Sequence, residues 1–429
     1  MTATFIEKML PQLIKWRRSF HQEPELGFME YITTYKIGTE LRRLGYQIHI
    51  GQEVMLDQTR FGVPSEKMLI EQEDIARKWG VEEEWLRKMH GGFTGVVATI
   101  DTGKKGNHLA FRFDIDALPI HESHDKAHFP FEQQYSSKIK NVMHACGHDG
   151  HMAIGLGLAT FISSNLEKLS GRFTLIFQPA EEGSRGAKAV VDKGWLDNVD
   201  YFYSGHIGIQ PLELGTVAAT TQGFLATTKF NVTFQGVASH AGMYPELGKN
   251  ALLAAAAAVT NLYAIPRHSE GVTHINVGKL VAGNGRNIIA NKSKMEVETR
   301  GETERINQHM FNYAKRIVKS AALMYDVQAY IEEVGNASAV TCNEELISHI
   351  TNACTNSNYV KKVIPVITVA GSEDASHMMK RVQENGGQAT YMLFGTKLKF
   401  PHHHERFDFQ EELLPIALET YINIVKAEL

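Results

Sequence analysis

The chain has few cysteines, no long apolar run and no excess of one charge. Its three cysteines, Cys146, Cys342 and Cys354, are an odd number without the spacing of a disulfide framework. This usage fits a reducing compartment, so we expect a cytoplasmic protein. The longest apolar run, ALLAAAAAV at 251–259, is far too short to cross a bilayer, so we expect no membrane partner.

Charge of both signs is nearly balanced, with 44 Lys and Arg against 48 Asp and Glu, for a net charge of −4. Nonspecific binding to nucleic acid or to acidic membranes needs a basic excess, so we expect neither partner. Hydrophobic residues make up 43% and charged residues 21%, as in soluble globular proteins. A chain of 429 residues is too long for one compact domain and about right for two.

Several short apolar runs predict buried strands that lead into residue types able to bind metal or move protons. HLAFRFDID ends at Asp114 and Asp116, RFTLIFQPAEEG at Glu181 and Glu182, VDYFYSGHIG near His206, VIPVITVAGSED at Glu373 and Asp374, and ATYMLFGT just before PHHHERF. Helical patterns such as HMAIGLGLATFISSNLEKL lie between these runs. This alternation predicts an α/β layer structure with a mainly parallel sheet, in which ligands bind beyond the carboxyl ends of the strands.

The pattern changes between about Phe224 and Ile331. FLATTKFNVTFQG and SKMEVETRG alternate like half-exposed strands, and NALLAAAAAVTNLYAI and INQHMFNYAKRIVKSAALMY have the spacing of amphipathic helices. We therefore predict a small α+β domain at 223–335, inserted into a larger domain made of 1–222 and 336–429.

The segment MHACGHDGH at 143–151 concentrates three histidines and one cysteine in nine residues. Cys146 and His148 lie two apart on a glycine-containing turn before a predicted helix, so both can point at one centre. Thiolate, imidazole and carboxylate together suit zinc and other borderline divalent ions. A cluster of surface histidines and a nucleophilic cysteine are the alternatives to a metal site.

Further candidate ligands follow the other predicted strands. Of the adjacent Glu181 and Glu182, one can bind metal while the other holds a proton. The alternative is a solvated turn, which is the more common setting for two adjacent glutamates. His206 follows another strand, and one of the three histidines at 402–404 is expected to be the last ligand.

Seven ordered motifs resemble the two-metal amidohydrolase and aminoacylase branch of peptidase family M20. They are HQEPELGF, FDIDALPI, HACGHDGHMA, QPAEEG, GHIG, SHAGMYPELGKNA and GSEDAS, and they cover nearly the whole chain. Within the branch the chain resembles the A-subunit group of p-aminobenzoyl-glutamate hydrolases. The segments that carry this resemblance are FGVPSEKMLI, which lies in an extra segment at about 55–92, GGFTGVVATIDTG, SGHIG, FLATTKF and HHHERFDF. Typical branch members lack the extra segment and usually carry His-x-Pro-x-Phe near the end, where Glu405 replaces the proline here.

The resemblance implies two divalent ions per subunit, Mn²⁺ or Zn²⁺, and a role for each candidate side chain. Glu181 is the implied general base, and Asp116 orients a ligand without binding metal. Asp114 stands where distant relatives have a metal-binding histidine, and we leave it out of the ligand set. The implied ligands are Cys146 as the bridging thiolate, His148, Glu182, His206 and His403, the last found by counting back four residues from Phe407.

The resemblance also implies that the inserted domain is a lid and dimerisation domain. His240 in SHAGMYP would then reach the active site of a partner subunit, and Asn287 in GNGRNII would contact substrate. Arg300 in ETRGE is a candidate for binding the substrate carboxylate. An ordinary loop asparagine and a solvated strand arginine are the alternatives for the last two.

The implied activity is hydrolysis of the amide bond in N-acyl or N-aroyl amino acids, with p-aminobenzoyl-glutamate as the first expected substrate. A general aminoacylase, a hippurate-type hydrolase or a dipeptide hydrolase is the alternative. A protein that kept the fold only to bind metal or peptide is disfavoured, because the base-plus-ligand pair Glu181 and Glu182 is intact. The expected protein partner is a second copy of the chain or a homologous B-type subunit.

Overall fold

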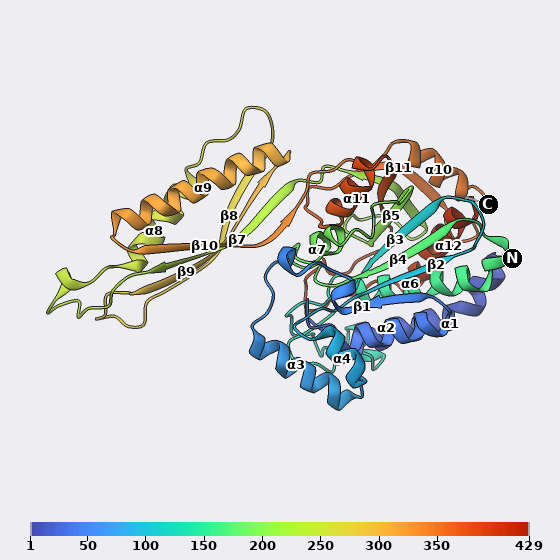
Figure 1. The fold of residues 1–429 in the computed structure, drawn as a ribbon, viewed down its shortest axis with the longest axis horizontal. Helices are drawn as coiled ribbons and strands as arrows, with labels where there is room; N and C mark the ends of the chain where they lie inside the picture. The colour runs from blue at the N-terminus through green and yellow to red at the C-terminus, as the bar shows by residue number, and fades with distance from the viewer. Residues whose placement is uncertain (1, 428–429) are drawn as a thin grey trace.

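The computed structural model describes residues 2–427 and shows a large α/β body with an elongated lobe extending from it (Figure 1). The body strands are β1 (Gln47–Ile50), β2 (Val96–Asp101), β3 (His108–Asp114), β4 (Arg172–Gln178), β5 (Tyr201–Ile207), β6 (Thr216–Gln222), β11 (Lys362–Thr368) and β12 (Gln388–Phe394). The lobe strands are β7 (Ala226–Gln235), β8 (Thr273–Ala282), β9 (Lys292–Gly301) and β10 (Gln328–Ala337).

The longer helices of the body are α1 (Thr2–Gln22), α2 (Tyr31–Arg43), α3 (Glu66–Trp79), α6 (His148–Ser164), α10 (Glu345–Ala353), α11 (Ala375–Glu384) and α12 (Leu413–Ala427). Its short helices are α4 (Glu83–Met89), α5 (Phe129–Glu132) and α7 (Ala187–Asp192), and the lobe contains α8 (Ala251–Tyr263) and α9 (Glu304–Met324). Single 3₁₀ turns lie at η1 (Gly51–Glu53), η2 (Asp57–Thr59), η3 (Leu166–Lys168) and η4 (Pro245–Leu247).

The body sheet has the strand order β1-β2-β4-β3-β5-β12-β6-β11, and its central strands β4, β3, β5 and β12 are all parallel. Both faces are covered by helices, so these strands are apolar along almost their whole length. Parallel strands place their carboxyl ends at one edge: Asp114 is level with Gln178, and His206 with Leu393. The predicted α/β class with a mainly parallel sheet is confirmed.

Helix α6 carries the histidine-rich segment to this edge and is buried on nearly every side. It lies close to β3 and β4 because Gly155 faces the sheet, where a Cβ would come within 2.7 Å of the Phe113 ring. Two apolar clusters fill the space on either face of the sheet. One joins α1, α2, α6, α10 and α12 to the sheet, and the other joins α7 and α11 to it.

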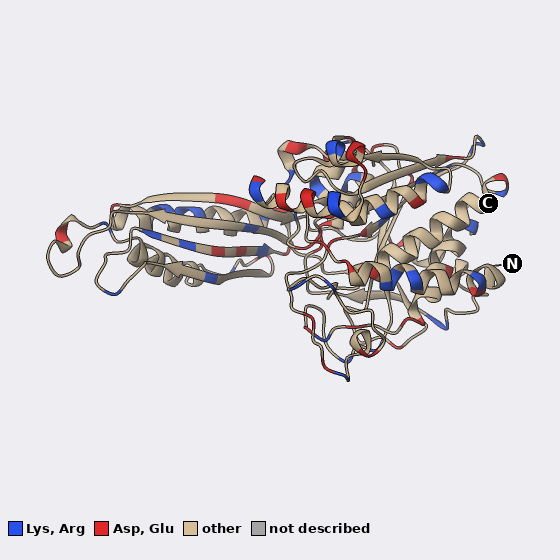
Figure 2. Ribbon diagram, turned by 90° about the horizontal axis from the view of Figure 1, so that it is seen from below, with Lys and Arg blue, Asp and Glu red and all other residues tan. Residues whose placement is uncertain are grey.

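The lobe sheet has the order β10-β7-β9-β8, and α8 and α9 cover one of its faces. Small side chains at Ala254, Ala255 and Ala258 of α8 are buried there, which allows α8 to pack closely on α9 and the sheet. The separate α+β unit expected from the sequence is therefore present; its predicted limits, 223 and 335, stay a prediction. Basic and acidic residues are interspersed along the lobe (Figure 2).

The extra segment at about 55–92 forms η2, which packs beside α7, and α3 and α4, which pack beside α2. Trp85 anchors the segment, since its ring is buried and lies so close to Gly38 of α2 that a Cβ there would come within 2.6 Å of it. Across residues 2–427, no helix combines the length and apolar character needed to traverse a bilayer.

Candidate metal centre

The candidate ligands converge where the central strands end and α6 begins. Ligand atoms of Cys146, Glu182 and His403 lie within 4.8 Å of one another, as do those of His148, Glu181 and Glu182. His206 joins them because its Nε2 is 3.4 Å from Cys146 Sγ. The structure thus brings together all five side chains expected to bind metal and the expected base; their roles stay predictions.

Two of the histidines have one ring nitrogen anchored and the other directed at the cluster. His148 Nδ1 donates to the carbonyl of Asp116 at 2.8 Å, and His206 Nδ1 donates to the carbonyl of Ile207 at 2.8 Å. Metal-binding histidines are generally oriented by such a hydrogen bond through the nitrogen that does not bind the ion. Burial and the neighbouring His151 ring lower the pKa of His206 well below its usual range. This shift favours the neutral imidazole, which is the form that binds a metal ion.

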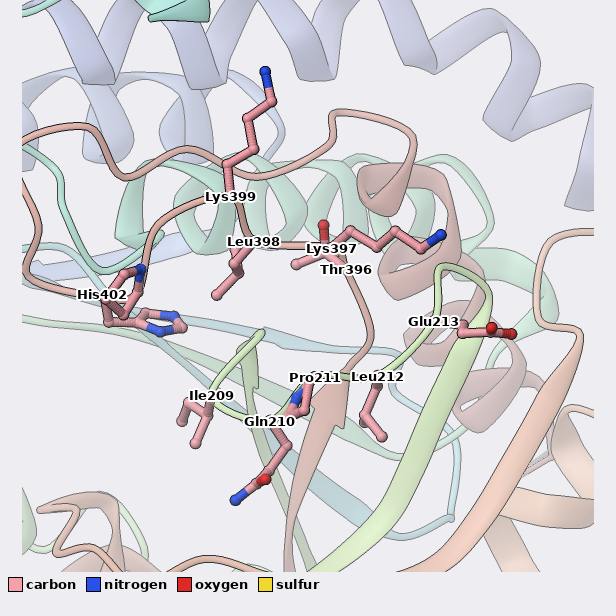
Figure 3. A pocket seen from close by; sticks show the side chains of 11 residues that line it. Ile209, Gln210, Pro211, Leu212, Glu213, Thr396, Lys397, Leu398, Lys399 and His402 are labelled. Carbon is pink, nitrogen blue, oxygen red and sulfur yellow. The ribbon is translucent and has the colours of Figure 1, made fainter.

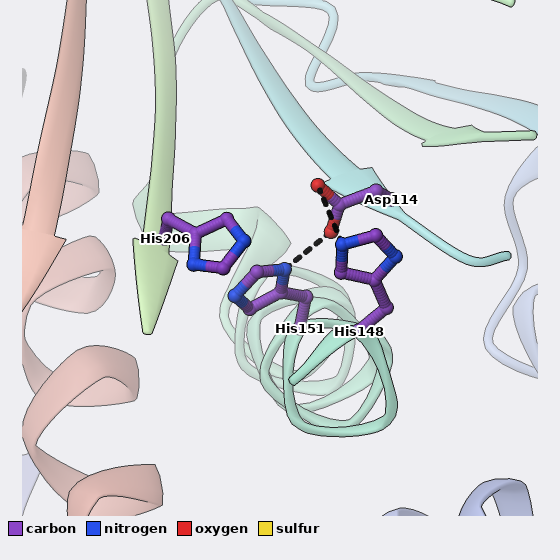
Figure 4. Close-up of side chains that lie close together, drawn as sticks. All are labelled: Asp114, His148, His151 and His206. Carbon is purple, nitrogen blue, oxygen red and sulfur yellow. Dashed lines mark hydrogen bonds and ion pairs between the residues drawn. The ribbon is translucent and has the colours of Figure 1, made fainter. Parts of the chain in front are cut away.

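Asp114 and His151 also belong to the cluster with His148 and His206 (Figure 4). Both ring nitrogens of His151 are engaged: Nδ1 donates to Asp114, and Nε2 accepts from the amide of Ile207 at 3.0 Å. The other Asp114 oxygen accepts from Arg112 at 2.8 Å. Burial opposes ionisation of Asp114, but His148, His151 and Arg112 hold its pKa well below the usual range. Through these hydrogen bonds, His151 and Asp114 connect α6 to β3 and β5.

Asp116 holds the loop that carries the two glutamates. Its carboxylate accepts from the amides of Glu181 at 3.1 Å and Glu182 at 2.9 Å. Burial and the charges of Glu373 and Glu182 raise the pKa of Glu181 well above its ordinary value. A carboxylate with a raised pKa can accept a proton and return it, which is what a general base requires.

The residues present fit a divalent cation. Within the described part of the chain, the buried atoms His148 Nε2 and Glu182 Oε1 have no hydrogen-bond partner, although both face the cluster. Buried polar atoms are rarely left unpaired in proteins. Burial and the Glu182 carboxylate raise the pKa of the Cys146 thiol well above its usual range, so a thiolate here needs a cation beside it.

The three consecutive histidines after β12 have different surroundings. His403 Nε2 lies 3.4 Å from Glu182 Oε1, and the backbone adopts a left-handed φ of 65° at this residue. His402 Nε2 donates instead to the carbonyl of Ile207 at 3.0 Å, and the His404 ring stacks on Phe400. The structure therefore places His403 at the cluster and its two neighbours outside it.

This difference predicts which histidine affects metal content. His403→Ala should reduce metal occupancy, measured by elemental analysis, because it removes a nitrogen that faces Glu182. His402→Ala and His404→Ala are matched controls and should retain the metal. Loss of metal in either control, with retention in His403→Ala, would show that the assigned position is wrong.

A cavity of about 630 Å³ adjoins the cluster (Figure 3). Its walls come from the loops after β5 and β12 and include the apolar Ile209, Leu212 and Leu398 and the basic Lys397. His402 joins the cavity to the cluster, because its ring centroid lies 5.3 Å from that of His206. Such a mixture of apolar walls and a few polar groups is typical of small-molecule sites.

The lobe residues expected to contact substrate lie outside the cluster. His240 is exposed and forms an isolated β-bridge with Ile288, and the carbonyl of Asn287 accepts from the amide of Ala241 at 3.0 Å. The yellow-green segment between β7 and α8, which contains His240, reaches the end of the lobe farthest from the body (Figure 1). The structure thus brings His240 and Asn287 together, away from the cluster of their own chain.

Arg300 also lies outside the cluster, on β9, where its guanidinium donates to Glu298 at 3.1 and 3.3 Å. Its expected role in binding a carboxylate gains no support from this pairing.

Sequence reasoning missed the buried network behind Glu181. Arg112 donates to Gln178 at 2.8 Å and forms ion pairs with Glu373 at 3.1 Å and Asp374 at 3.2 Å. Glu181, Glu373 and Asp374 have carboxylate oxygens within 4.8 Å of one another. An arginine inside the apolar run HLAFRFDID was the available signal, since a buried charge requires partners.

A model of the peptidase family M20/M25/M40 matches residues 110–427. The chain is 45% identical to indole-3-acetyl-aspartic acid hydrolase of Enterobacter agglomerans over 97% of this chain and 95% of that protein. It is equally 45% identical to the A-type subunit of p-aminobenzoyl-glutamate hydrolase from Escherichia coli (strain K12), again over 97% of this chain and 95% of that protein.

Two solved structures are similar over nearly the whole length. An aminobenzoyl-glutamate utilization protein from Klebsiella pneumoniae superimposes with a TM-score of 0.86 and 41% identity, covering 99% of this chain and 98% of that one. A Bacillus subtilis protein described as a dinuclear metal binding peptidase of family M20 gives a TM-score of 0.65 and 25% identity, covering 98% of each chain.

Proposed function

This chain belongs to peptidase family M20/M25/M40 and is a hydrolase of amide bonds, and we propose that it cleaves N-acyl or N-aroyl amino acids with two divalent metal ions. The observation that carries the proposal is the convergence of thiol, imidazole and carboxylate groups at one sheet edge, with His148 Nε2 and Glu182 Oε1 facing the cluster. We assign the ligands to Cys146, His148, Glu182, His206 and His403, and the ions to Mn²⁺ or Zn²⁺.

The chain's own residues supply the proton transfers. When bound, two divalent ions would lower the pKa of a water molecule and polarise the amide carbonyl. Glu181 accepts the proton of the attacking water and then donates it to the departing amine. The Asp116 carboxylate accepts a hydrogen bond from the backbone amide of Glu181 at 3.1 Å, which keeps Glu181 in place. His240 of a neighbouring protomer would donate to the oxygen of the carbonyl under attack.

We propose p-aminobenzoyl-glutamate as the first substrate, cleaved to p-aminobenzoate and glutamate. Two relatives at 45% identity are named for amides of glutamate and aspartate, which supports an acidic amino-acid half. The cavity beside His402 has apolar walls that suit an aromatic acyl group, and Lys397 in its lining suits a carboxylate. A general aminoacylase, a hippurate-type hydrolase or a dipeptide hydrolase is the alternative.

The lobe at 223–335 is proposed to close over the substrate and to carry the contact between protomers, while 1–222 and 336–429 form the metal-binding domain. Apolar side chains exposed on the lobe, among them Met243, Leu247 and Val281, support a contact with another chain. The partner is a second copy or a homologous B-type subunit, since the Escherichia coli relative is named as one of the subunits of its enzyme. We propose a cytoplasmic location because Cys146, Cys342 and Cys354, all buried, form no disulfide with one another.

Metal removal followed by a substrate panel tests the proposal. The protein treated with a chelator should release no amine from p-aminobenzoyl-glutamate, and Mn²⁺ or Zn²⁺ should restore the release. Among p-aminobenzoyl-glutamate, hippurate and acetyl-amino acids, the first should give the highest kcat/KM. Full activity after exhaustive metal removal would contradict the mechanism, and a preference for hippurate or an acetyl-amino acid would establish the alternative.

A further inference from the structure

The loop that carries Glu181 and Glu182 has an uncommon backbone conformation. Ala180 has φ 52° and Ser184 φ 60°, both in the left-handed region that residues with a side chain seldom adopt. Such residues keep this conformation only where surrounding contacts hold them. Asp116 provides two of those contacts, through the amides of Glu181 and Glu182.

Arg185 stabilises the C-terminal end of the same loop through hydrogen bonds. Its Nε donates to the carbonyl of Glu182 at 2.8 Å, and its Nη1 donates to the carbonyl of Gly62 at 3.2 Å. The amide of Phe61 donates back to the carbonyl of Arg185 at 3.3 Å. Arg185 thus connects the backbone of Glu182 to the extra segment at about 55–92.

The guanidinium occupies a narrow slot. It lies 5.6 Å from the centre of the Phe28 ring, and a Cβ on Gly27 would come within 2.3 Å of Nη2. A Cβ on Gly62, where φ is +57°, would lie 3.1 Å from Arg185 Cδ. The slot therefore fixes the guanidinium, and its two hydrogen-bond acceptors are backbone carbonyls of the protein itself.

The lobe also contacts this loop, through β10. The amide of Asn336 in β10 donates to the carbonyl of Ser184 at 2.9 Å, and a Cβ on Gly335 would come within 2.1 Å of the Gly183 carbonyl oxygen. The extra segment, the lobe and the body therefore all meet at this loop. A change at one of these contacts moves the backbone that carries both glutamates.

We infer that Arg185 is a positioning residue for Glu182 and Glu181, and that the extra segment supports it through Phe61 and Gly62. This inference rests on the proposed function, because it assigns Arg185 to the same site. Direct binding of the substrate carboxylate is the competing role. The observed donors favour positioning, since Nε and Nη1 already bind the carbonyls of Glu182 and Gly62.

Arg185→Ala should weaken Mn²⁺ binding and reduce kcat at saturating Mn²⁺, each by ~10-fold or more, because outer partners of metal ligands typically contribute ~10- to 100-fold. KM should change less than about twofold if the residue does not touch substrate. Lys188→Ala is the matched control. It removes a positive charge three residues away whose ammonium pairs with Asp192 at 2.9 Å, and it should leave both quantities unchanged.

Gly62→Ala disturbs the same contact from the extra segment and should act in the same direction. Arg185→Lys provides a milder change if Arg185→Ala does not fold. A large rise in KM with unchanged kcat and Mn²⁺ affinity would identify Arg185 as a substrate-binding residue. Unchanged kcat and Mn²⁺ affinity in both Arg185 variants would also overturn the inference. Because Mn²⁺ affinity needs no substrate, this test stands apart from a failure of the proposed activity.

Discussion

Replacing Glu181 with glutamine should abolish turnover while the metal stays bound. Glutamine keeps the size and shape of the side chain but accepts no proton, and loss of a general base typically costs ~10²- to 10⁴-fold in rate. The neighbourhood of the side chain favours this role, because burial and the Glu373 carboxylate raise the pKa of Glu181 well above its ordinary value. The measurements are kcat on the best substrate and metal content by elemental analysis.

Glu182→Gln is the matched control for this experiment. It makes the same chemical change one residue away, at a carboxylate that faces Cys146 and His403, so it should lower metal content as well as rate. The two variants therefore separate proton transfer from metal binding. A near-native rate in Glu181→Gln would move the base role elsewhere, with Glu373 as the first candidate because its carboxylate belongs to the same cluster.

His240→Ala should reduce turnover by ~10²-fold or more and leave metal content unchanged, as expected for the loss of one donor to a developing oxyanion. His240 is exposed in the segment between β7 and α8, and its Nδ1 accepts from the amides of Gly242 at 3.1 Å and Met243 at 3.0 Å. A proton on Nε2 therefore remains available for donation. Because the lobe extends away from the body, we expect His240 to act after closure or in the active site of a partner.

Mixing two inactive variants distinguishes these routes. A dimer of one His240→Ala chain with one Glu181→Gln chain has one site in which both residues are intact if His240 acts across the interface. Activity should then reappear on mixing. Exchange of protomers without recovered activity would show that His240 acts within its own chain or takes no part in catalysis.

The sequence was sufficient to predict the α/β class and the edge of the sheet at which the candidate side chains converge. The signal was physical: apolar runs such as RFTLIFQ and YFYSGHI are typical of strands buried on both faces, and metal-binding or proton-transferring residue types lie at or just beyond the end of each. Parallel pairing of β4, β3, β5 and β12 then brings those residues to one edge. The position of His403 between two other histidines came from the resemblance, because spacing alone left three choices.

The parts that could not be predicted depend on contacts between distant segments. His151 followed the expected ligands by only a few residues, yet its role depends on Asp114 from β3 and the Ile207 amide from β5. Arg185 has no distinguishing pattern around it in the sequence, and only its hydrogen bonds to the carbonyls of Glu182 and Gly62 show what it holds. Hydrogen bonds between residues so far apart leave no periodic pattern in a single sequence.

The pairing of β7 with β10 has a consequence for how the molecule is assembled. These strands carry the chain into and out of the lobe, and they are antiparallel neighbours in which Thr227 lies opposite Ala337. From the side of the body, the inserted lobe is therefore equivalent to one long hairpin whose two ends are already adjacent. The entropy of closing such a loop grows only slowly with its length. A lobe attached in this way can change in length or surface during evolution without disturbing the order of the body strands, whose ends carry the candidate ligands.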